Sequence, residues 1–193
     1  MLHKNQTLLL ATNNTHKFVE ARNILLKHDL HLEMVNIEKL EIQHNDLREI
    51  AFYSLRNAIK KVKMPLLVED AGLFIDRLSG FPGPYSSYVY KTLGIQGVLK
   101  LLEGETDRTA QFKSVVAYAT LLTPPKTFLG VSHGRILNEQ RGSRGFGFDP
   151  IFMPRNRKRT FAEMPPEEKN IISHRAKAFD KFAKWYSDEK LSS

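Results

Sequence analysis

Two adjacent acidic residues, Glu69 and Asp70, follow the apolar run at 66–68. Because such a run is typical of a buried strand, we expect both carboxylates at the end of a strand. Open α/β sheets bind ligands at strand ends, and Mg²⁺ takes one or two carboxylates together with the phosphates of its substrate. The pair therefore indicates metal-assisted phosphate chemistry. The alternative interpretation is a pair of carboxylates that caps a turn.

Basic residues stand where two helices are expected to begin. Lys17 lies in the first turn of the first expected helix, and His174 and Arg175 follow Ser173, the expected N-cap of the last helix. The helix dipole disfavours a positive charge there unless an anion lies nearby. A phosphate would supply that anion, and the turn at 12–15 (Thr-Asn-Asn-Thr) adds hydroxyl and amide donors. The alternative is that each cation is an ordinary exposed charge.

The segment at 145–150 reads Gly-Phe-Gly-Phe-Asp-Pro. Its glycines give the backbone conformational freedom, and its phenylalanines offer aromatic faces. Such a loop could let a planar base stack on a ring while backbone groups approach the edge of the base. The alternative is that both phenylalanines anchor a turn in the hydrophobic core.

The elements that must position these residues alternate between strands and helices. The apolar spacing predicts strands at 7–11, 30–37, 66–68, 109–122 and 127–137, and helices at 14–27, 47–62, 85–102 and from 173 onward. Asp46 and Glu49 form a start like a capping box, and a break is expected near Gly94. The pattern predicts an α/β fold with a mixed sheet in a single domain over residues 1–193.

Composition narrows the classes of function. The 193 residues include no cysteine, which excludes disulfides and thiolate nucleophiles, and the histidines lack the spacing of a zinc site. The net charge of +8 indicates an anionic partner. The basic run at 155–159 would suit nucleic acid or a solvated loop. With no targeting segment and no apolar run near the roughly 18 residues of a membrane span, we expect a soluble, cytoplasmic protein without a membrane partner.

Several motifs, in order along the chain, resemble those of the inosine triphosphate pyrophosphatase family. They lie at 68–73 (Val-Glu-Asp-Ala-Gly-Leu), 80–86 (Gly-Phe-Pro-Gly-Pro-Tyr-Ser), 145–152 (Gly-Phe-Gly-Phe-Asp-Pro-Ile-Phe), 160–164 (Thr-Phe-Ala-Glu-Met), 168–170 (Glu-Lys-Asn) and 173–175 (Ser-His-Arg). The segment at 81–89 looks closest to archaeal members. The resemblance implies an elongated mixed β-sheet flanked by helices, two lobes with an active-site cleft between them, and a homodimer.

The resemblance also implies roles for individual residues. Asp70 would be the general base and, together with Glu41, a ligand of Mg²⁺. The residues expected to contact the substrate are Thr12, Asn13, Asn14, Thr15, His16, Lys17, Ser54, Arg56, Asp70, Ala71, Phe146, Gly147, Phe148, Asp149, Lys169, His174 and Arg175. Within this set, the turn that begins at Thr12 would hold the triphosphate, and Phe146 would stack on the base.

Three positions depart from the family pattern. Asn13 stands where the family usually has glycine. Ser54 occupies the place of a substrate-contacting lysine, for which Arg56 could substitute from a neighbouring position. The segment at 86–89 reads Ser-Ser-Tyr-Val where an arginine is common, so the role of that arginine has no counterpart here.

The predicted reaction is the magnesium-dependent hydrolysis of ITP, dITP and XTP to the monophosphate and pyrophosphate. Asp70 would orient or deprotonate the water that attacks the α-phosphorus. Hydrogen-bond donors at His174 and Arg175 would bind the 6-oxo group of a purine and disfavour the amino group of adenine. The alternatives are a nucleic-acid-binding module without catalysis and a pyrophosphatase for modified pyrimidine nucleotides; we expect no stable binding of nucleic acid.

Overall fold

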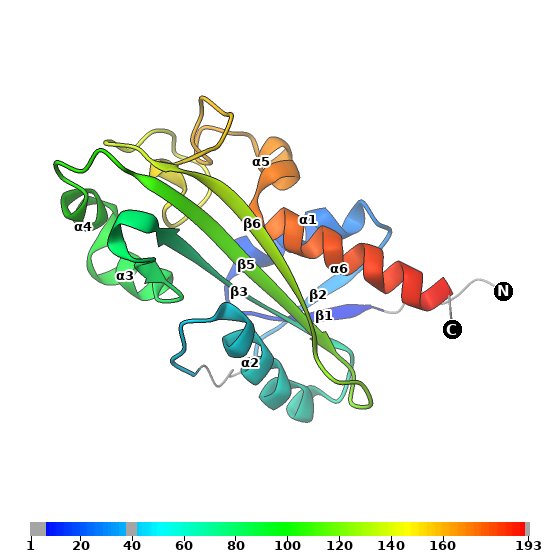
Figure 1. The fold of residues 1–193 in the computed structure, drawn as a ribbon. Helices are drawn as coiled ribbons and strands as arrows, with labels where there is room; N and C mark the ends of the chain where they lie inside the picture. Colours follow the sequence, from blue (N-terminus) through cyan, green and yellow to red (C-terminus); the bar gives the residue numbers. More distant parts are fainter. Residues whose placement is uncertain (1–6, 38–41, 192–193) are drawn as a thin grey trace.

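The computed structural model describes residues 7–37 and 42–191 (Figure 1). Its strands are β1 (Leu8–Ala11), β2 (Leu32–Val35), β3 (Leu66–Ile75), β4 (Pro82–Gly83), β5 (Thr109–Ala119), β6 (Lys126–Ile136) and β7 (Phe152–Pro154). Its α-helices are α1 (Thr15–Leu26), α2 (Leu47–Val62), α3 (Ser86–Thr92), α4 (Gly94–Leu101), α5 (Pro166–Ile172) and α6 (His174–Leu191). Two short 3₁₀ turns lie at Asp76–Leu78 and Asp149–Ile151.

The strands form one mixed sheet with the order β2-β1-β3-β5-β6-β7. β1 runs parallel to β2 and β3, whereas β3, β5, β6 and β7 pair in antiparallel fashion. The long β5–β6 hairpin runs the length of the molecule and gives the sheet its elongated shape (Figure 1). One edge of β3 pairs with β5 along its whole length. The opposite edge of β3 pairs with β1 through Leu66 and Leu67 and with β4 through Leu73 and Phe74. The middle of that edge of β3 therefore has no strand beside it among the described residues.

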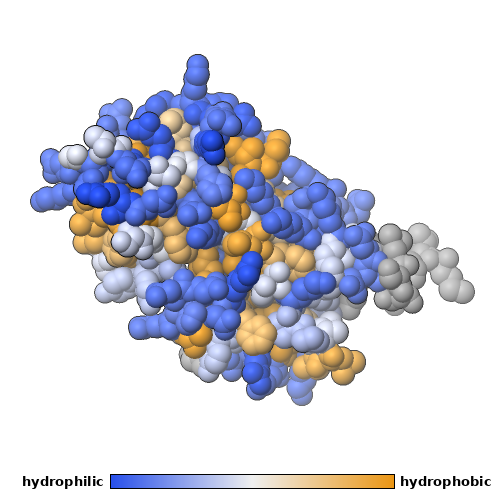
Figure 2. Space-filling view, viewed as in Figure 1, coloured by the Kyte–Doolittle hydropathy of each residue, from blue (hydrophilic) through white to orange (hydrophobic). Residues whose placement is uncertain are grey.

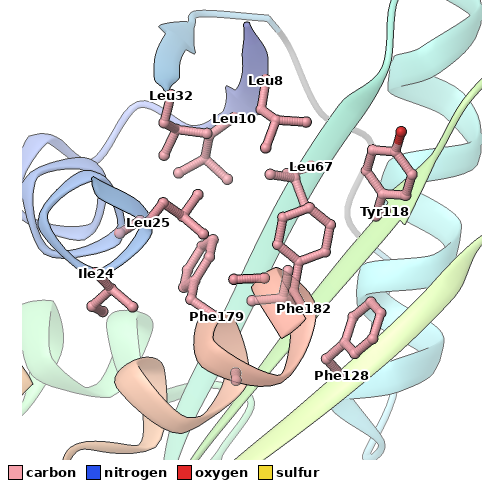
Figure 3. Packing of buried hydrophobic residues seen from close by; sticks show 14 of the residues in the cluster. Leu8, Leu10, Ile24, Leu25, Leu32, Leu67, Tyr118, Phe128, Phe179 and Phe182 are labelled. Atoms are coloured by element: carbon pink, nitrogen blue, oxygen red, sulfur yellow. The ribbon is translucent and has the colours of Figure 1, made fainter. Parts of the chain in front are cut away.

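Helices cover both faces of the sheet. α1 and α6 pack on one face and α2 on the other (Figure 1). Figure 3 shows the cluster under α6, in which Leu8 and Leu10 of β1 meet Leu25 of α1 and Phe179 and Phe182 of α6. A second cluster, which includes Leu73, Phe112 and Phe161, lies farther along the sheet beside α3 and α4. A third, around Val68, Val115 and Leu55, lies under α2.

The helix boundaries follow from local sequence. The side chain of Asp46 caps α2 by accepting a hydrogen bond from the Arg48 backbone N–H at 2.9 Å. The Ser173 hydroxyl accepts one from the Ala176 backbone N–H at 3.1 Å at the start of α6. The chain from 85 to 102 divides at Gly94, which has a φ of +65°. These three features were predicted from the sequence and are confirmed.

The mixed α/β sheet flanked by helices is confirmed, but the strand that carries the acidic pair differs from its prediction. β3 runs from Leu66 to Ile75, so Glu69 and Asp70 lie in the middle of a strand and not at its end. The prediction was wrong because the acidic pair interrupts the apolar run, whereas the register with β5 continues unbroken past it from Leu66 to Ile75. The sequence analysis also missed α5, β4 and β7. None of the helices in residues 7–37 and 42–191 is both long and apolar enough to cross a membrane.

Candidate active site

The turn between β1 and α1 carries the predicted phosphate contacts. The Thr12 hydroxyl accepts a hydrogen bond from the Asn14 backbone N–H at 3.1 Å, and the Asn14 side chain accepts one from the Lys17 backbone N–H at 3.1 Å. Asn13 is not among the described residues with positive φ, so the residue that replaces glycine brings no left-handed strain. The turn is thus held by its own side chains at a helix start, an arrangement that favours anions.

A buried carboxylate on β3 holds cations from two distant segments. The Lys17 ammonium lies 2.9 Å from Glu69 Oε2, and Arg175 Nη2 lies 3.1 Å from Glu69 Oε1. The Ser114 hydroxyl donates to the same Oε1 at 2.6 Å. Burial alone would raise the pKa of Glu69, but Arg175 and then Lys17 outweigh it and hold the pKa far below its usual range. Glu69 is therefore ionised at neutral pH.

The ion pairs continue from Arg175 toward the loop at 145–150, which we call the aromatic loop. Arg175 Nη1 lies 2.6 Å from Glu20 Oε2, and Lys169 Nζ lies 2.7 Å from Glu20 Oε1. Lys169 Nζ also lies 2.6 Å from Asp149 Oδ2, which accepts a hydrogen bond from the Phe146 backbone N–H at 2.9 Å. We call these six side chains the ion-pair chain; in order they are Lys17, Glu69, Arg175, Glu20, Lys169 and Asp149.

Burial and charge act in opposite directions at the other two carboxylates of the ion-pair chain. Burial would raise the pKa of Glu20, but Arg175 and Lys169 outweigh it and lower the pKa. At Asp149 burial is the stronger effect, so the pKa is raised even though Lys169 lies beside the carboxyl group. Cations and carboxylates alternate along the ion-pair chain, so each buried charge has an opposite charge beside it.

The ring of Phe146 lies against the ion-pair chain. It stacks on the His16 ring with 5.3 Å between centroids and an interplanar angle of 18°. Lys169 Nζ lies 5.2 Å, and Arg175 Cζ 5.5 Å, from the centroid of Phe146. The ring thus sits among cations and next to the start of α1, where a planar base could replace His16 as its stacking partner.

The backbone of the aromatic loop depends on two glycines. Gly145 has a φ of +73°, and a Cβ atom there would come within 2.1 Å of the Asp149 carboxylate; Gly147 has a φ of +61°. Phe148 is buried and packs edge-on against Tyr90. The two phenylalanines of the loop therefore differ, because Phe148 anchors the loop in the core while the ring of Phe146 faces the ion-pair chain.

His174, the first residue of α6, is buried and neutral. Its ring stacks on Phe112 with 4.6 Å between centroids and an interplanar angle of 11°. Burial, followed by the charge of Arg175, lowers its pKa well below the ordinary value. Within the described part of the chain, its Nδ1 atom is buried without a hydrogen-bond partner. A neutral imidazole with a free ring nitrogen can give or accept one hydrogen bond to a ligand.

The side chains of Glu69 and Asp70 lie on opposite faces of the sheet. Leu67 belongs to the cluster under α1 and α6, and Val68 belongs to the cluster under α2. Because side chains alternate along a strand, Glu69 lies on the face of Leu67, and Asp70 lies on the face of Val68. Asp70 Oδ1 accepts a hydrogen bond from the Ala71 backbone N–H at 3.0 Å. A ligand that contacts both Glu69 and Asp70 must therefore pass around the edge of β3 at the point where no described strand lies beside it.

Ser54 and Arg56 of α2, the two candidates to replace the lysine of other family members, differ in burial. Ser54 is 3% exposed and lies on the helix face that packs against the sheet. Arg56, two positions later, is exposed. Only Ser54 is therefore directed toward the sheet face that carries Asp70.

A groove of about 500 Å³ lies beside the start of α2 on the same face as Asp70. Its lining residues are His44, Asn45, Asp46, Leu47, Arg48, Phe74, Lys113, Val115 and Leu129. Val115 is the register partner of Asp70, and Lys113 Nζ lies 4.4 Å from the centroid of the Phe74 ring. Figure 2 shows hydrophobic side chains at the surface in the middle of the view, within a mostly hydrophilic face. The groove thus brings the cations Arg48 and Lys113 to the sheet face that carries Asp70, which the sequence analysis did not anticipate.

Residues 8–185 match the model of the Ham1 family. The chain belongs to the Ham1 family. Archaeal relatives of this Ham1 protein include a dITP/XTP pyrophosphatase of Methanopyrus kandleri, which is 49% identical over 181 residues, with 94% of this chain and 96% of the relative covered. One from Saccharolobus solfataricus is 47% identical over 185 residues and covers 96% of each chain. The family predicted from the sequence motifs is confirmed.

Solved structures of Ham1 proteins share the fold. The Ham1 protein of Coxiella burnetii matches with a TM-score of 0.84 at 33% identity, and covers 95% of this chain and 99% of its own. The Ham1 protein of Staphylococcus aureus matches with a TM-score of 0.83 at 28% identity, and covers 95% of this chain and all of its own. The likeness therefore extends over nearly the whole chain.

The contacts of this Ham1 protein join three segments that the sequence analysis had chosen separately. They are the turn and helix start at 12–17, the loop at 145–149 and the segment at 169–175, which joins the second half of α5 to the start of α6. Glu41, the expected partner of Asp70 in binding metal, lies outside the described residues. Within the described ranges, no three histidine or acidic side chains lie close enough together to hold a metal ion. The partly buried carboxylate of Asp70 has the donor chemistry that suits Mg²⁺.

Sequence reasoning missed three parts of the site. Glu20 carries a recognisable signal, since it follows Lys17 by one helical turn and so shares its side of α1. Ser114 carries none, because only the pairing of β5 with β3 brings it to Glu69. Glu69 itself was considered as half of a metal-binding pair, whereas the structure surrounds it with a hydroxyl and two cations of the protein.

Proposed function

We propose that this Ham1 protein hydrolyses dITP, ITP and XTP to the corresponding monophosphate and pyrophosphate. The observation that carries the proposal is the ion-pair chain, which connects an anion-binding turn at Lys17 with an aromatic loop at Phe146. A site with phosphate chemistry at one end and base chemistry at the other fits a nucleotide. The archaeal relatives at 47–49% identity, which are named dITP/XTP pyrophosphatases, support this choice of substrate.

The base would bind between Phe146 and the start of α6. The face of Phe146 offers a stacking surface, and the Arg175 guanidinium lies 5.5 Å from the centroid of that ring. His174, the residue before Arg175, offers a ring nitrogen for a hydrogen bond. A 6-oxo purine presents an acceptor to these donors. The 6-amino group of adenine would leave a buried donor unpaired, which costs about 1–3 kcal/mol. The site therefore favours hypoxanthine and xanthine over adenine.

The triphosphate would lie at the turn that begins with Thr12. The start of α1 supplies backbone N–H groups, and the ammonium of Lys17 supplies a positive charge that is about one-fifth exposed. The expected contacts from Thr12, Asn13, Asn14, Thr15 and Lys17 belong to this end of the site. Ser54 or Arg56 of α2 would take the place of the lysine found in other family members.

Asp70 would act on the attacking water. Its carboxylate lies on the α2 face, opposite the face on which Lys17 and Arg175 pair with Glu69, and it would orient or deprotonate water at the α-phosphorus. Asp70 and Glu41 would also hold Mg²⁺, which supplies neutralisation of the charge on the phosphates when it is bound. The leaving group is pyrophosphate. We further propose that the protein acts in the cytoplasm as a homodimer and does not bind nucleic acid stably.

The experiment that tests the proposal measures pyrophosphate release, with and without Mg²⁺, from ITP, dITP, XTP, GTP, ATP and modified pyrimidine triphosphates. The proposal expects release from the first three, dependence on the metal ion, and little release from ATP. Faster hydrolysis of a modified pyrimidine triphosphate would favour the pyrimidine alternative. Salt-sensitive binding of DNA or RNA without any pyrophosphate release would favour the nucleic-acid alternative.

A further inference from the structure

Glu69 occupies a particular place in the ion-pair chain. Its carboxylate touches Lys17, which belongs to the phosphate end of the site, and Arg175, which belongs to the base end. In sequence, Arg175 follows Glu69 by 106 positions, while Lys17 precedes it on another element. The carboxylate is therefore the point at which the two ends of the site meet.

The surroundings of Glu69 hold its carboxylate in one position. Ser114 donates to Oε1 at 2.6 Å, and Arg175 approaches the same oxygen with Nε at 3.2 Å and Nη2 at 3.1 Å. The side chains of Glu69 and Arg175 are each 2% exposed. A buried carboxylate of this kind needs its counter-charges, because an uncompensated charge in the interior is strongly unfavourable.

The two cations that pair with Glu69 differ in how easily a ligand can reach them from the solvent. The Lys17 side chain is 20% exposed, so a phosphate can reach its ammonium from the solvent. Arg175 is held on its other side by Glu20 at 2.6 Å and has little contact with solvent, so a base would reach its guanidinium only by way of the neighbouring Phe146 ring, whose centroid lies 5.5 Å away. A phosphate at Lys17 would draw that cation's charge away from Glu69, and the carboxylate would then depend more strongly on Arg175.

We propose that Glu69 is a positioning residue that couples binding of the base to binding of the phosphates. This inference rests on the proposed function, because it assigns the two ends of the site to the two halves of a nucleotide. A phosphate at Lys17 tightens the contact between Glu69 and Arg175 and so fixes the guanidinium for the base. A base at Arg175 orders the same carboxylate and so fixes Lys17 for the phosphates, since such coupling is reciprocal.

A purely structural role for Glu69 gives a different expectation. In that case its replacement would lower the melting temperature without changing how one half of the substrate affects the other. The two halves can be supplied as separate molecules, inosine and inorganic pyrophosphate. Inosine carries no charge, so it has no direct electrostatic attraction to pyrophosphate, and the carboxylate of Glu69 supplies the link between them.

The test is calorimetric titration of inosine into the wild-type protein with Mg²⁺, in the absence and in the presence of saturating pyrophosphate. We expect pyrophosphate to tighten inosine binding by about fivefold or more, the lower range of typical coupling between sites. In Glu69→Gln this factor falls to about one, while each half still binds alone. The matched control is Glu105→Gln, which breaks the exposed ion pair between Arg77 and Glu105 far from the site and keeps the wild-type factor.

A second variant covers the case in which Glu69→Gln does not fold. Lys17→Met removes the partly exposed cation on the phosphate side and leaves Glu69 with Arg175 and Ser114, so it also loses the coupling. Absence of coupling in the wild-type protein, or full coupling in either variant, would overturn the inference. If the wild-type protein binds neither inosine nor pyrophosphate, the proposed function fails instead.

Discussion

Glu69 and Asp70 are neighbours in β3, yet their side chains lie on opposite faces of the sheet. Glu69 is enclosed by Ser114, Lys17 and Arg175 on the face covered by α1 and α6. Asp70 lies partly buried on the α2 face, where the register places Val115 beside it. The alternation of side chains along the strand thus places the carboxylate that pairs with Lys17 and Arg175 and the proposed catalytic carboxylate on opposite faces of the sheet.

Replacement of Asp70 by Asn should remove catalysis and preserve the fold. The amide can still accept the hydrogen bond from the Ala71 backbone N–H, but it cannot take a proton from water. We expect the turnover of dITP to fall by about 10²–10⁴-fold, the usual contribution of a general base. Turnover and melting temperature are measured together, with the exposed Asp76→Asn as control. Near-normal turnover in Asp70→Asn would refute the catalytic assignment.

Replacement of Phe146 by Ala should weaken binding more than it slows the reaction. Loss of one stacked base on an aromatic ring costs about 1–3 kcal/mol, which corresponds to a KM for dITP raised by roughly 5- to 150-fold. Phe146→Tyr keeps the ring and should retain a KM close to that of the wild-type protein. An unchanged KM in Phe146→Ala would place the base elsewhere.

The neutral state of His174 makes the folded protein sensitive to acid. Its folded-state pKa lies below the ordinary value of about 6.5, so the unfolded chain binds more protons as the pH falls through that value. Stability due to this residue is therefore present above about pH 6.5 and is lost below it, with a slope of at most about 1.4 kcal/mol per pH unit. The depressed pKa values of Glu20 and Glu69 extend the loss to more acidic pH.

Melting temperatures recorded between about pH 7.5 and about pH 5.5 measure the slope that His174 contributes. In His174→Asn, which cannot titrate, the decrease over this interval should be smaller than in the wild-type protein. An equal decrease in both proteins would show that burial does not lower the pKa of His174 in the folded state.

Gly130 of β6 sets how closely the start of α6 approaches the sheet. A Cβ atom there would lie 2.0 Å from the His174 carbonyl oxygen and 2.5 Å from the Ala178 backbone nitrogen. Because backbone atoms cannot give way as a side chain does, we expect Gly130→Ala to lower the free energy of unfolding by about 1–3 kcal/mol. The displaced helix start should also reduce the preference for dITP over dATP. Wild-type stability and preference in this variant would contradict the close packing.

The sequence predicts the helices better than the site. The apolar spacing and the caps at Asp46 and Ser173 are local, and they predicted the bounds of α2 and the start of α6. β3 was predicted too short, since the acidic pair resembles the end of a strand unless its pairing with β5 is known. Local patterns predict an element well when its boundary depends on nearby residues.

The ion-pair chain lies beyond what local patterns can predict. Lys17, His174 and Arg175 could be singled out because a cation at a helix start needs an anion. The anions that meet Lys17 and Arg175 here are Glu69 and Glu20 of the protein, and the pairing of Glu69 with Arg175 joins residues 106 positions apart. Only the packing of α6 against the sheet brings these charges together.

The most direct test of the account follows the hydrolysis of dITP in heavy-oxygen water and identifies both products. Attack at the α-phosphorus predicts dIMP and pyrophosphate in equal amounts, with the oxygen label in dIMP alone, and a rate for dITP far above that for dATP. Formation of dIDP and inorganic phosphate, label in the pyrophosphate, or an absence of hydrolysis would contradict it.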